Sequence, residues 1–436
     1  MVRSLAMWRG DQTTGLGARF AKLWAASTIS ALGSGLATIA TPLFVASRTS
    51  SPLIISAAFG IAWLPWLLFA LPGGVLVDRV DRRRLMIVVD WSRVAAMGVL
   101  ATAVLTGWAS IPLLYAVLFI VNTGEIIFRS ASQAMIPSVV PVSMLERANG
   151  WLVGGDTVAQ QMLAGPLSGF LFVLAAGLPF LANAGTYAAS ALLIAWIAGS
   201  YRPAQPAAAG PAAQKRMIRS VWTDVAEGFG FLIRQRLLRT MAVLIGLLNV
   251  TLTGALAVLV LLARERLGLG SVSYGLLFTC MAVGGILGSV IGDRLIAWVT
   301  DTWTIRVGLL IEAGLHLTLA TSRNTPLVCV ALFAFGVHGA LWMIVSSSLR
   351  QRLTPPAMLG RVGSTNLFIA AGGNCVGALL AGGFASRFGI TAPYWVAFVV
   401  AAVVSVTTWR VFSKSAVAAA YATPPPGEVT ELATTG

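Results

Sequence analysis

The sequence GGVLVDRVDRRRLM occupies residues 73–86 and separates two apolar runs that are each long enough to cross a bilayer. Six of its fourteen residues carry a charge, whereas only 10% of the whole chain does. Arginine offers forked donors to carboxylates and to the carbonyls that end a helix, so this loop can act as an electrostatic latch. A simpler interpretation is a loop whose arginines hold it in the cytoplasm. The charged residues are Asp78, Arg79, Asp81, Arg82, Arg83 and Arg84.

The composition indicates a protein with many membrane spans. The chain has 436 residues, of which 57% are hydrophobic, and its mean hydropathy is +0.84. Soluble proteins carry about 25% charged residues, far more than this chain does. Its net charge of +15 lies in the short breaks between apolar runs and follows no single helix face. Anionic lipid headgroups are therefore the expected partners of these cations, and a nucleic acid is not.

Apolar runs of about 20 residues, the length that crosses a bilayer as a helix, recur along the whole chain. They predict an all-α membrane protein with twelve transmembrane helices in two pseudo-symmetric halves of six. The predicted spans are 20–46, 54–77, 85–106, 111–134, 147–174, 178–200, 238–263, 272–298, 303–321, 326–349, 361–386 and 391–412.

The distribution of basic residues predicts the orientation of these spans. With the N-terminus inside, 24 of the 30 Lys and Arg residues lie on the inner side, five lie on the outer side and Arg93 lies within the third span. We therefore expect a multi-pass protein of the inner (plasma) membrane with both termini in the cytoplasm.

Composition also divides the chain into five regions. A cytoplasmic tail at 1–19 precedes the first six-helix half at 20–200. A cytoplasmic linker at 201–237 is rich in Ala and Pro and then becomes amphipathic at helical spacing. The second half covers 238–412, and the tail at 413–436 is expected to be disordered. The halves echo each other weakly, because Gln, Pro and Arg recur in order at 133, 137 and 147 and at 351, 355 and 361.

The charged loop resembles the conserved loop between helices 2 and 3 of the major facilitator superfamily. One position departs, because Asp81 stands where the family usually has Gly, which makes the turn less permissive of positive φ and adds a carboxylate. The resemblance implies a secondary active transporter in which this loop, extended by the neighbouring pair Asp90 and Arg93, locks a cytoplasmic gate against the second half. The matching residues are Gly74, Leu76, Asp78, Arg79, Arg82 and Arg83.

Two further stretches are similar to exporters of that superfamily. Gly165, Pro166 and Gly169 in the fifth span resemble the Gly-Pro motif of proton-coupled antiporters, although Phe170 replaces its usual second Gly. Residues 224–239 resemble the entry to the seventh span in the branch that contains the enterobactin exporter and macrolide-efflux proteins. The resemblance therefore implies export driven by the proton gradient.

Ionisable residues inside spans are costly, so each is a candidate for function. Glu125 and Arg129 are spaced i, i+4 and can pair locally, and by resemblance they face the transport path. Asp156 has no basic residue within a turn and lies roughly 13 Å deep at 1.5 Å per residue. Desolvation there favours protonation, so Asp156 can bind and release a proton. The competing interpretation is a neutral Asp156 hydrogen-bonded to Gln160.

Other intramembrane polar residues are weaker candidates. Glu312 and His316 are spaced i, i+4 and could form a relay, but their span is peripheral in the family. His338 is more typical of a packing residue than of a site. Gly284, Gly288 and Gly292 repeat every four residues, which favours close helix packing.

The residues present exclude several enzyme classes. None of the three lysines follows a glycine, which excludes a Walker A loop, and neither HExxH nor GxSxG occurs. We therefore expect no enzyme activity, no cofactor and no metal. The predicted function is a monomeric antiporter that exchanges protons for a hydrophobic small molecule, such as a drug, a siderophore or a secondary metabolite. A proton-driven importer and a non-transporting receptor or scaffold on the same fold remain alternatives.

Overall fold

The computed structural model describes residues 16–77, 80–202, 223, 225–355 and 358–412. These residues are almost entirely helical and contain no β-strand. The fifth span is a continuous helical stretch made of α5, η2 and α6, of which η2 is a π-helix. The elements of the first half are α1 (Gly17–Arg48), α2 (Pro52–Val77), α3 (Arg82–Leu105), α4 (Ile111–Val139), η1 (Val142–Met144), α5 (Leu145–Asp156), η2 (Thr157–Leu163), α6 (Ala164–Leu174) and α7 (Leu178–Ala195).

The second half repeats this architecture. Its first span contains a π-helix, η3, close to its end, whereas the π-helix of the first half lies in the fifth span. The elements are α9 (Arg236–Ala257), α10 (Leu259–Leu261), η3 (Leu262–Arg266), α11 (Ser271–Val299), α12 (Asp301–Thr321), α13 (Thr325–Leu353), α14 (Leu359–Phe388) and α15 (Ala392–Thr408).

The twelve predicted spans are confirmed within the described residues. Eleven helical stretches are long and apolar enough to cross a membrane, and α15 is a shorter apolar helix of 17 residues. Two spans begin where a polar side chain caps the helix and a proline follows it. Ser110 accepts a hydrogen bond from the Leu113 N–H, and Asn324 accepts one from the Leu327 N–H.

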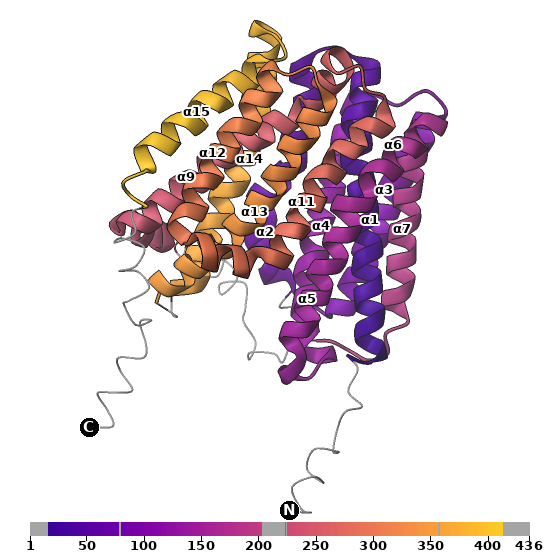
Figure 1. Cartoon of the computed structure of the whole chain (residues 1–436). Helices are drawn as coiled ribbons and strands as arrows, with labels where there is room; N and C mark the ends of the chain where they lie inside the picture. The colour runs from indigo at the N-terminus through magenta and orange to yellow at the C-terminus, as the bar shows by residue number, and fades with distance from the viewer. Residues whose placement is uncertain (1–15, 78–79, 203–222, 224, 356–357, 413–436) are drawn as a thin grey trace, which may run out of the picture.

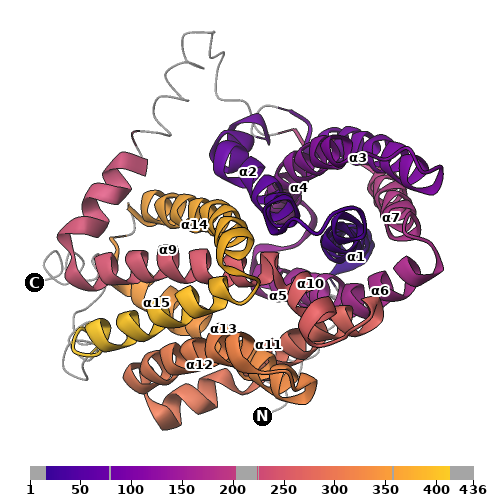
Figure 2. The same cartoon turned by 90° about the horizontal axis from the view of Figure 1, so that it is seen from above.

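The two halves lie side by side, with α1 to α7 on one side and α9 to α15 on the other (Figures 1 and 2). Helix α1 begins and α15 ends on the lower face in Figure 1, which we call the terminal face. Helix α1 ends and α2 begins on the other side, which we call the opposite face. The halves contact each other mainly through α2 with α14 and through α6 with α11.

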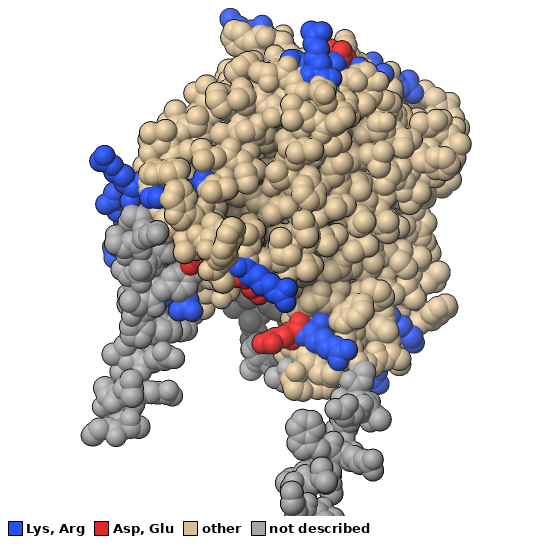
Figure 3. Space-filling view, in the orientation of Figure 1, with Lys and Arg blue, Asp and Glu red and all other residues tan. Residues whose placement is uncertain are grey.

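These contacts close the molecule at the opposite face. Gly382 near the end of α14 leaves no room for a side chain, because an added Cβ would overlap Ser56 near the start of α2. Arg264 of η3 donates a hydrogen bond to the Ala46 carbonyl at the end of α1, with an Nη1–O distance of 2.7 Å. The surface is instead hollowed between the halves on the terminal face (Figure 3).

The described part of the linker that follows residue 222 packs against the second half. Residues 225–234 are helical, and most of the earlier part of the predicted amphipathic stretch lies outside the described residues. Leu232 is buried and Phe229 is half exposed. Glu227 forms an ion pair of 2.7 Å with Arg361 at the start of α14, and Thr365 donates a hydrogen bond to the Val225 carbonyl.

Helix α15 lies at the edge of the second half, where it packs mainly on α12. The Arg306 guanidinium of α12 donates to the Trp409 carbonyl just past the end of α15, with an Nη2–O distance of 2.6 Å. The same guanidinium lies 4.6 Å from the centre of the Trp409 ring. Arg306 therefore ties the end of this short helix to its neighbour.

Candidate functional site

Arg93 of α3 is the centre of a buried polar network in the first half. Its side chain is fully buried and contacts two carboxylates, Asp90 at 3.1 Å and Glu125 of α4. It also donates to the hydroxyls of Ser30 and Ser34 of α1, with N–O distances of 3.2 Å each. Four donor contacts from one guanidinium thus join α1, α3 and α4, which is the kind of pairing a buried charge requires.

The surroundings of Arg93 are shaped to hold it. The guanidinium carbon lies 3.7 Å from the centre of the Tyr187 ring of α7, which is a cation–π contact. Gly124 of α4 provides the space, because a Cβ at this position would lie 2.9 Å from Arg93 Cδ and 3.2 Å from Val89 Cγ1. The small residue next to Glu125 therefore lets α3 and α4 enclose the arginine.

A second ion pair lies close to this network. Arg129 of α4 contacts Asp156 at the end of α5, with an Nη2–Oδ2 distance of 2.9 Å. The side chains of Arg129 and Asp156 are 42% and 26% exposed, whereas Asp90 and Arg93 are fully buried. This pair is accessible, and it links the fourth and fifth spans.

The predicted pairing of these residues was partly wrong. The local pair of Asp90 and Arg93 is present. Glu125, however, pairs with Arg93 of another helix and does not pair with Arg129. No basic residue lies within a turn of Asp156 on its own helix, as the sequence indicated, and its cation Arg129 comes from a neighbouring helix. Asp90 and Arg93 accordingly belong to the network inside the first half, not to an extension of the charged loop.

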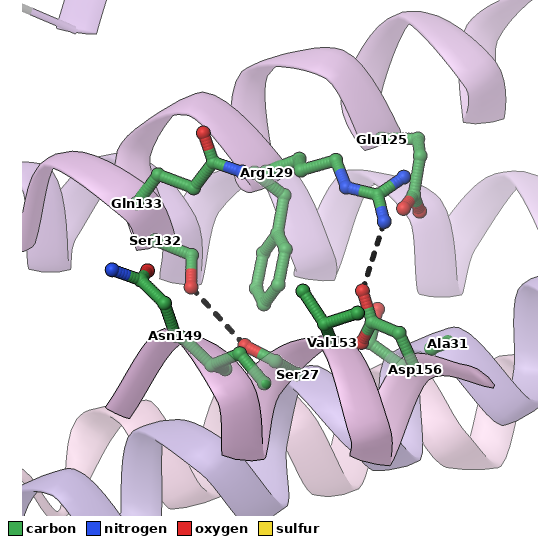
Figure 4. Close-up of a pocket in the computed structure, with 12 residues that line it drawn as sticks. Ser27, Ala31, Glu125, Arg129, Ser132, Gln133, Asn149, Val153 and Asp156 are labelled. Atoms are coloured by element: carbon green, nitrogen blue, oxygen red, sulfur yellow. Dashed lines mark hydrogen bonds and ion pairs between the residues drawn. The ribbon is translucent and has the colours of Figure 1, made fainter. Parts of the chain in front are cut away.

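A small polar cavity lies between α1, α4 and α5 and has a volume of about 80 Å³. Figure 4 shows Arg129 reaching across it to Asp156, and Ser132 facing Ser27. A cavity of this size has room for a few water molecules, whereas drug-sized ligands occupy about 300–1,000 Å³. It suits a hydrated proton site better than a substrate site. Its lining is Ser27, Ser30, Ala31, Glu125, Phe128, Arg129, Ser132, Gln133, Asn149, Leu152, Val153 and Asp156.

The charged loop is tied to its own half in this structure. Arg82 donates to the Ala134 carbonyl in α4 at 2.8 Å, and Arg83 donates to the Ile194 carbonyl at the end of α7. Gly74 lies in the last turn of α2. Asp78 and Arg79 lie outside the described residues. A gate that locks against the second half belongs to the state that is closed on the terminal face, and this structure is closed on the opposite face.

Asp81, the departure from the family pattern, caps α3. Its carboxylate accepts hydrogen bonds from the Arg84 N–H at 3.0 Å and from the Ser200 hydroxyl and Tyr201 N–H at 2.9 Å each. Burial alone favours the neutral acid, but these hydrogen bonds and the Arg84 charge hold the pKa of Asp81 below its usual value. Its φ of −63° needs no glycine. The carboxylate therefore pairs with the residues that follow α7 as well as within its own loop.

Replacing Asp81 by alanine is expected to destabilise the protein by about 1–2 kcal/mol, because a helix cap and two tertiary hydrogen bonds are lost. Since the folded-state pKa of Asp81 lies below the unfolded value, its contribution is complete above the unfolded pKa and is lost as the pH falls through the folded one. Thermal unfolding in detergent should show the full difference at pH 7 and a smaller one below about pH 4. Asp81→Asn is the matched control. Equal stability of Asp81→Ala and the wild type at pH 7 would show that the cap is unimportant.

The Gly-Pro motif lies at the contact between the two halves. A Cβ on Gly165 would overlap the Gly275 carbonyl of α11, and one on Gly169 would overlap the Ser271 carbonyl. Pro166 has no N–H and so leaves the Met162 carbonyl without its helical partner. Thr279 of α11 donates a hydrogen bond to that carbonyl at 3.2 Å. The motif therefore lets α6 and α11 approach closely where the opposite face is closed.

Sequence reasoning missed three partners of Arg93, namely Ser30, Ser34 and Tyr187. Two of them could have been found, because Ser27, Ser30 and Ser34 are spaced so that they lie on one face of the first helix. Nothing in the sequence marks Tyr187 as a partner, since a single tyrosine in an apolar span is usually a packing residue.

Comparison with known sequences finds relatives that are named as transporters or exporters. A family model described as transmembrane secretion effector matches residues 17–428. An uncharacterised MFS-type transporter of Sinorhizobium fredii is 25% identical over 363 residues, which cover 82% of this chain and 86% of the relative. The enterobactin exporter EntS of Escherichia coli is 24% identical over 379 residues, 84% of each chain. Macrolide efflux protein A of Streptococcus pyogenes is 30% identical over 133 residues, 30% of this chain and 33% of the relative.

Solved structures with the same fold are also transporters. A mutant of the nucleoside transporter NupG superposes with a TM-score of 0.74 at 11% identity, covering 92% of this chain and 100% of the other. A bacterial homologue of the iron transporter ferroportin in an inward-facing state gives a TM-score of 0.72 at 14% identity, with the same coverage. At such identities the likeness shows the fold alone.

Proposed function

The chain belongs to the transmembrane secretion effector family of the major facilitator superfamily, and from this membership we propose that it exports a hydrophobic small molecule in exchange for protons. It is a multi-pass membrane transporter and not an enzyme. The printed names of two relatives, an enterobactin exporter and a macrolide efflux protein, support export and a substrate such as a siderophore, a drug or a secondary metabolite.

The proposed exchange for protons rests on the balance of charges in the intramembrane network of the first half. Three carboxylates, Asp90, Glu125 and Asp156, share two guanidinium groups, Arg93 and Arg129. An intramembrane carboxylate without a counter-ion is costly, so the network favours binding one proton. Arg93 serves two carboxylates at once, so the three negative charges outnumber the positive ones. Protonation relieves this shortage.

The cavity beside the network gives the proton a route. The side chains of Glu125 and Asp156 are 18% and 26% exposed, and both line the water-sized cavity. Protonation of Asp156 weakens its ion pair with Arg129. Protonation of Glu125 leaves Asp90 as the one ionised carboxylate in contact with Arg93. Each change alters the contacts between helices of the first half and so biases the equilibrium between the two transport states.

The proposal also includes the assembly state, the energy source and the orientation of the protein. The chain works as a monomer without a cofactor, and the proton gradient drives it. We place it in the plasma membrane with the terminal face in the cytoplasm, as the basic residues predict. Asp78, Arg79, Arg82 and Arg83 then form the cytoplasmic gate, which contacts the second half when the opposite face opens.

The proposal is tested by transport in inverted membrane vesicles with a panel of fluorescent lipophilic dyes, macrolides and catecholate siderophores. An imposed proton gradient, acid inside, should drive substrate accumulation, and a protonophore should abolish it. Glu125→Gln and Asp156→Asn should lower accumulation to the level seen with the protonophore, because each removes a proton acceptor. Glu146→Gln, which neutralises an exposed carboxylate at the start of α5, is the matched control and should transport normally.

Two results would reject the proposal in different ways. Accumulation of the same compounds only in right-side-out vesicles, driven by acid outside, would identify an importer. Intact cellular function in a variant that carries both Glu125→Gln and Asp156→Asn would favour a receptor or scaffold, because such a protein has no need for proton acceptors in its spans.

A further inference from the structure

The second half contains a separate group of buried ionisable side chains, between α12 and α13. Glu312 and His316 lie on α12 and His338 lies on α13, and their exposed fractions are 2%, 0% and 4%. The sequence contains two histidines in all, and both are in this group. Glu312 stands eleven residues after Asp301, hence roughly 16 Å along the helix at 1.5 Å per residue, which is near the middle of the span.

The two imidazoles flank the single carboxylate. His316 Nε2 lies 3.4 Å from one Glu312 oxygen, and His338 Nε2 lies 3.9 Å from the other. Gly308, one turn before Glu312, makes room for the second imidazole, because a Cβ there would overlap the His338 ring. The missing side chain of Gly308 on α12 therefore leaves the space that the His338 imidazole of α13 occupies.

The group is short of hydrogen bonds. Within the described residues, Glu312 Oε1 and both ring nitrogens of His316 are buried and have no hydrogen-bond partner. Unpaired buried polar atoms are costly, and native structures contain few of them. A hydrogen between Glu312 Oε1 and His316 Nε2, on a neutral or a doubly protonated imidazole, would convert their 3.4 Å contact into a charge-assisted hydrogen bond to the carboxylate.

The neighbouring helices supply no permanent counter-ion. Within the described chain, no ion pair joins Glu312 to any arginine or lysine, in contrast to the carboxylates of the first half. An ionised Glu312 would therefore need a protonated imidazole beside it, and otherwise the carboxyl itself would hold the proton. The other ionisable residues on these helices and on those packed against them are Asp301 and Arg306 on α12, Cys329, Arg350 and Arg352 on α13, Tyr274, Cys280, Asp293 and Arg294 on α11, Tyr394 on α15, and Arg236 and Arg239 on α9.

We propose that Glu312, His316 and His338 form a second intramembrane proton site, which holds one exchangeable proton in the second half of the transporter. The proton is shared between a carboxylate and an imidazole, so the group can pass between a neutral state and a charged one. Each half would then contain its own proton acceptor. The inference does not depend on what the transporter carries or on the direction of transport.

The two histidines make the site directly observable. We suggest ring-¹⁵N-histidine labelling of the protein, purified with a tag that contains no histidine and reconstituted in lipid. Solid-state NMR then reports the protonation of these two imidazoles and of no other residue. Between about pH 5 and pH 8, where imidazole titrates, at least one ring should change from singly to doubly protonated. His316→Gln and His338→Gln assign the two signals.

Replacement of the carboxylate tests the shared proton. In Glu312→Gln the doubly protonated signal should be lost from this pH range, because the imidazolium no longer has a counter-ion. Glu146→Gln should leave the titration unchanged. Two imidazoles that remain neutral across the range in the wild type would overturn the proposal and identify a static packing group. Titration that survives in folded Glu312→Gln would also overturn it, and the wild-type titration decides the matter if that variant does not fold.

Discussion

Replacement of Arg93 by glutamine is expected to destabilise the protein by about 3–5 kcal/mol, the usual cost of removing one partner of a buried ion pair. The change leaves Asp90 and Glu125 without their cation and removes the contact with Tyr187. Glutamine retains two donors but cannot reach both carboxylates and both serines. Thermal unfolding of the purified protein in detergent measures the effect, and the midpoint should fall by many degrees or the folded protein should be lost.

Arg129→Gln is the matched control for this experiment. It removes the same charge from a pair whose members are 42% and 26% exposed, and exposed pairs contribute about 0.2–1 kcal/mol. A triple variant that combines Arg93→Gln with Asp90→Asn and Glu125→Gln removes the unpaired charges and should recover much of the stability. Equal unfolding midpoints for Arg93→Gln and Arg129→Gln would show that the network contributes little to folding.

Replacement of Gly165 by valine is expected to block transport while the protein still folds. The new side chain would meet the backbone carbonyl of Gly275, which cannot move without displacing α11. Overpacking of this kind costs about 1–3 kcal/mol, and the cost falls only on the state in which the halves touch at the opposite face. The equilibrium should therefore shift roughly 5- to 150-fold toward the state that is open there.

Vesicle transport together with gel filtration in detergent measures this effect. Gly165→Val should elute as a single folded species and transport poorly. Gly185→Val on α7 is the matched control, because its added Cβ would have no neighbour within 4 Å. Transport at the wild-type rate by Gly165→Val would mean that close contact between α6 and α11 is not required in the cycle.

Much of the fold could be predicted from hydropathy, because each span must be about 20 apolar residues long whatever its neighbours are. The predicted fourth span began at residue 111, and α4 begins at Ile111. Its end was predicted at 134, five residues before Val139, and Pro137 lies within the last turn of the helix. Span length is a local property, so it can be read without knowledge of the packing.

The site could be predicted only where its contacts are local. Asp90 and Arg93 are neighbours on one helix, and their pairing follows from spacing alone. The partners Arg93 and Glu125 are 32 positions apart, and Arg129 and Asp156 are 27 apart. Such pairs depend on how each helix is rotated about its axis, which hydropathy does not report in spans that are apolar on most faces.

The shortness of α15 has a consequence for the surrounding lipid. Its 17 residues extend about 26 Å along the helix axis, less than the roughly 30 Å of a typical hydrocarbon core. Arg306 and Trp409 mark where this helix ends, and indole rings favour the headgroup level. The two leaflets are therefore expected to draw together beside α15, and likewise beside α7 of the first half, which has 18 residues.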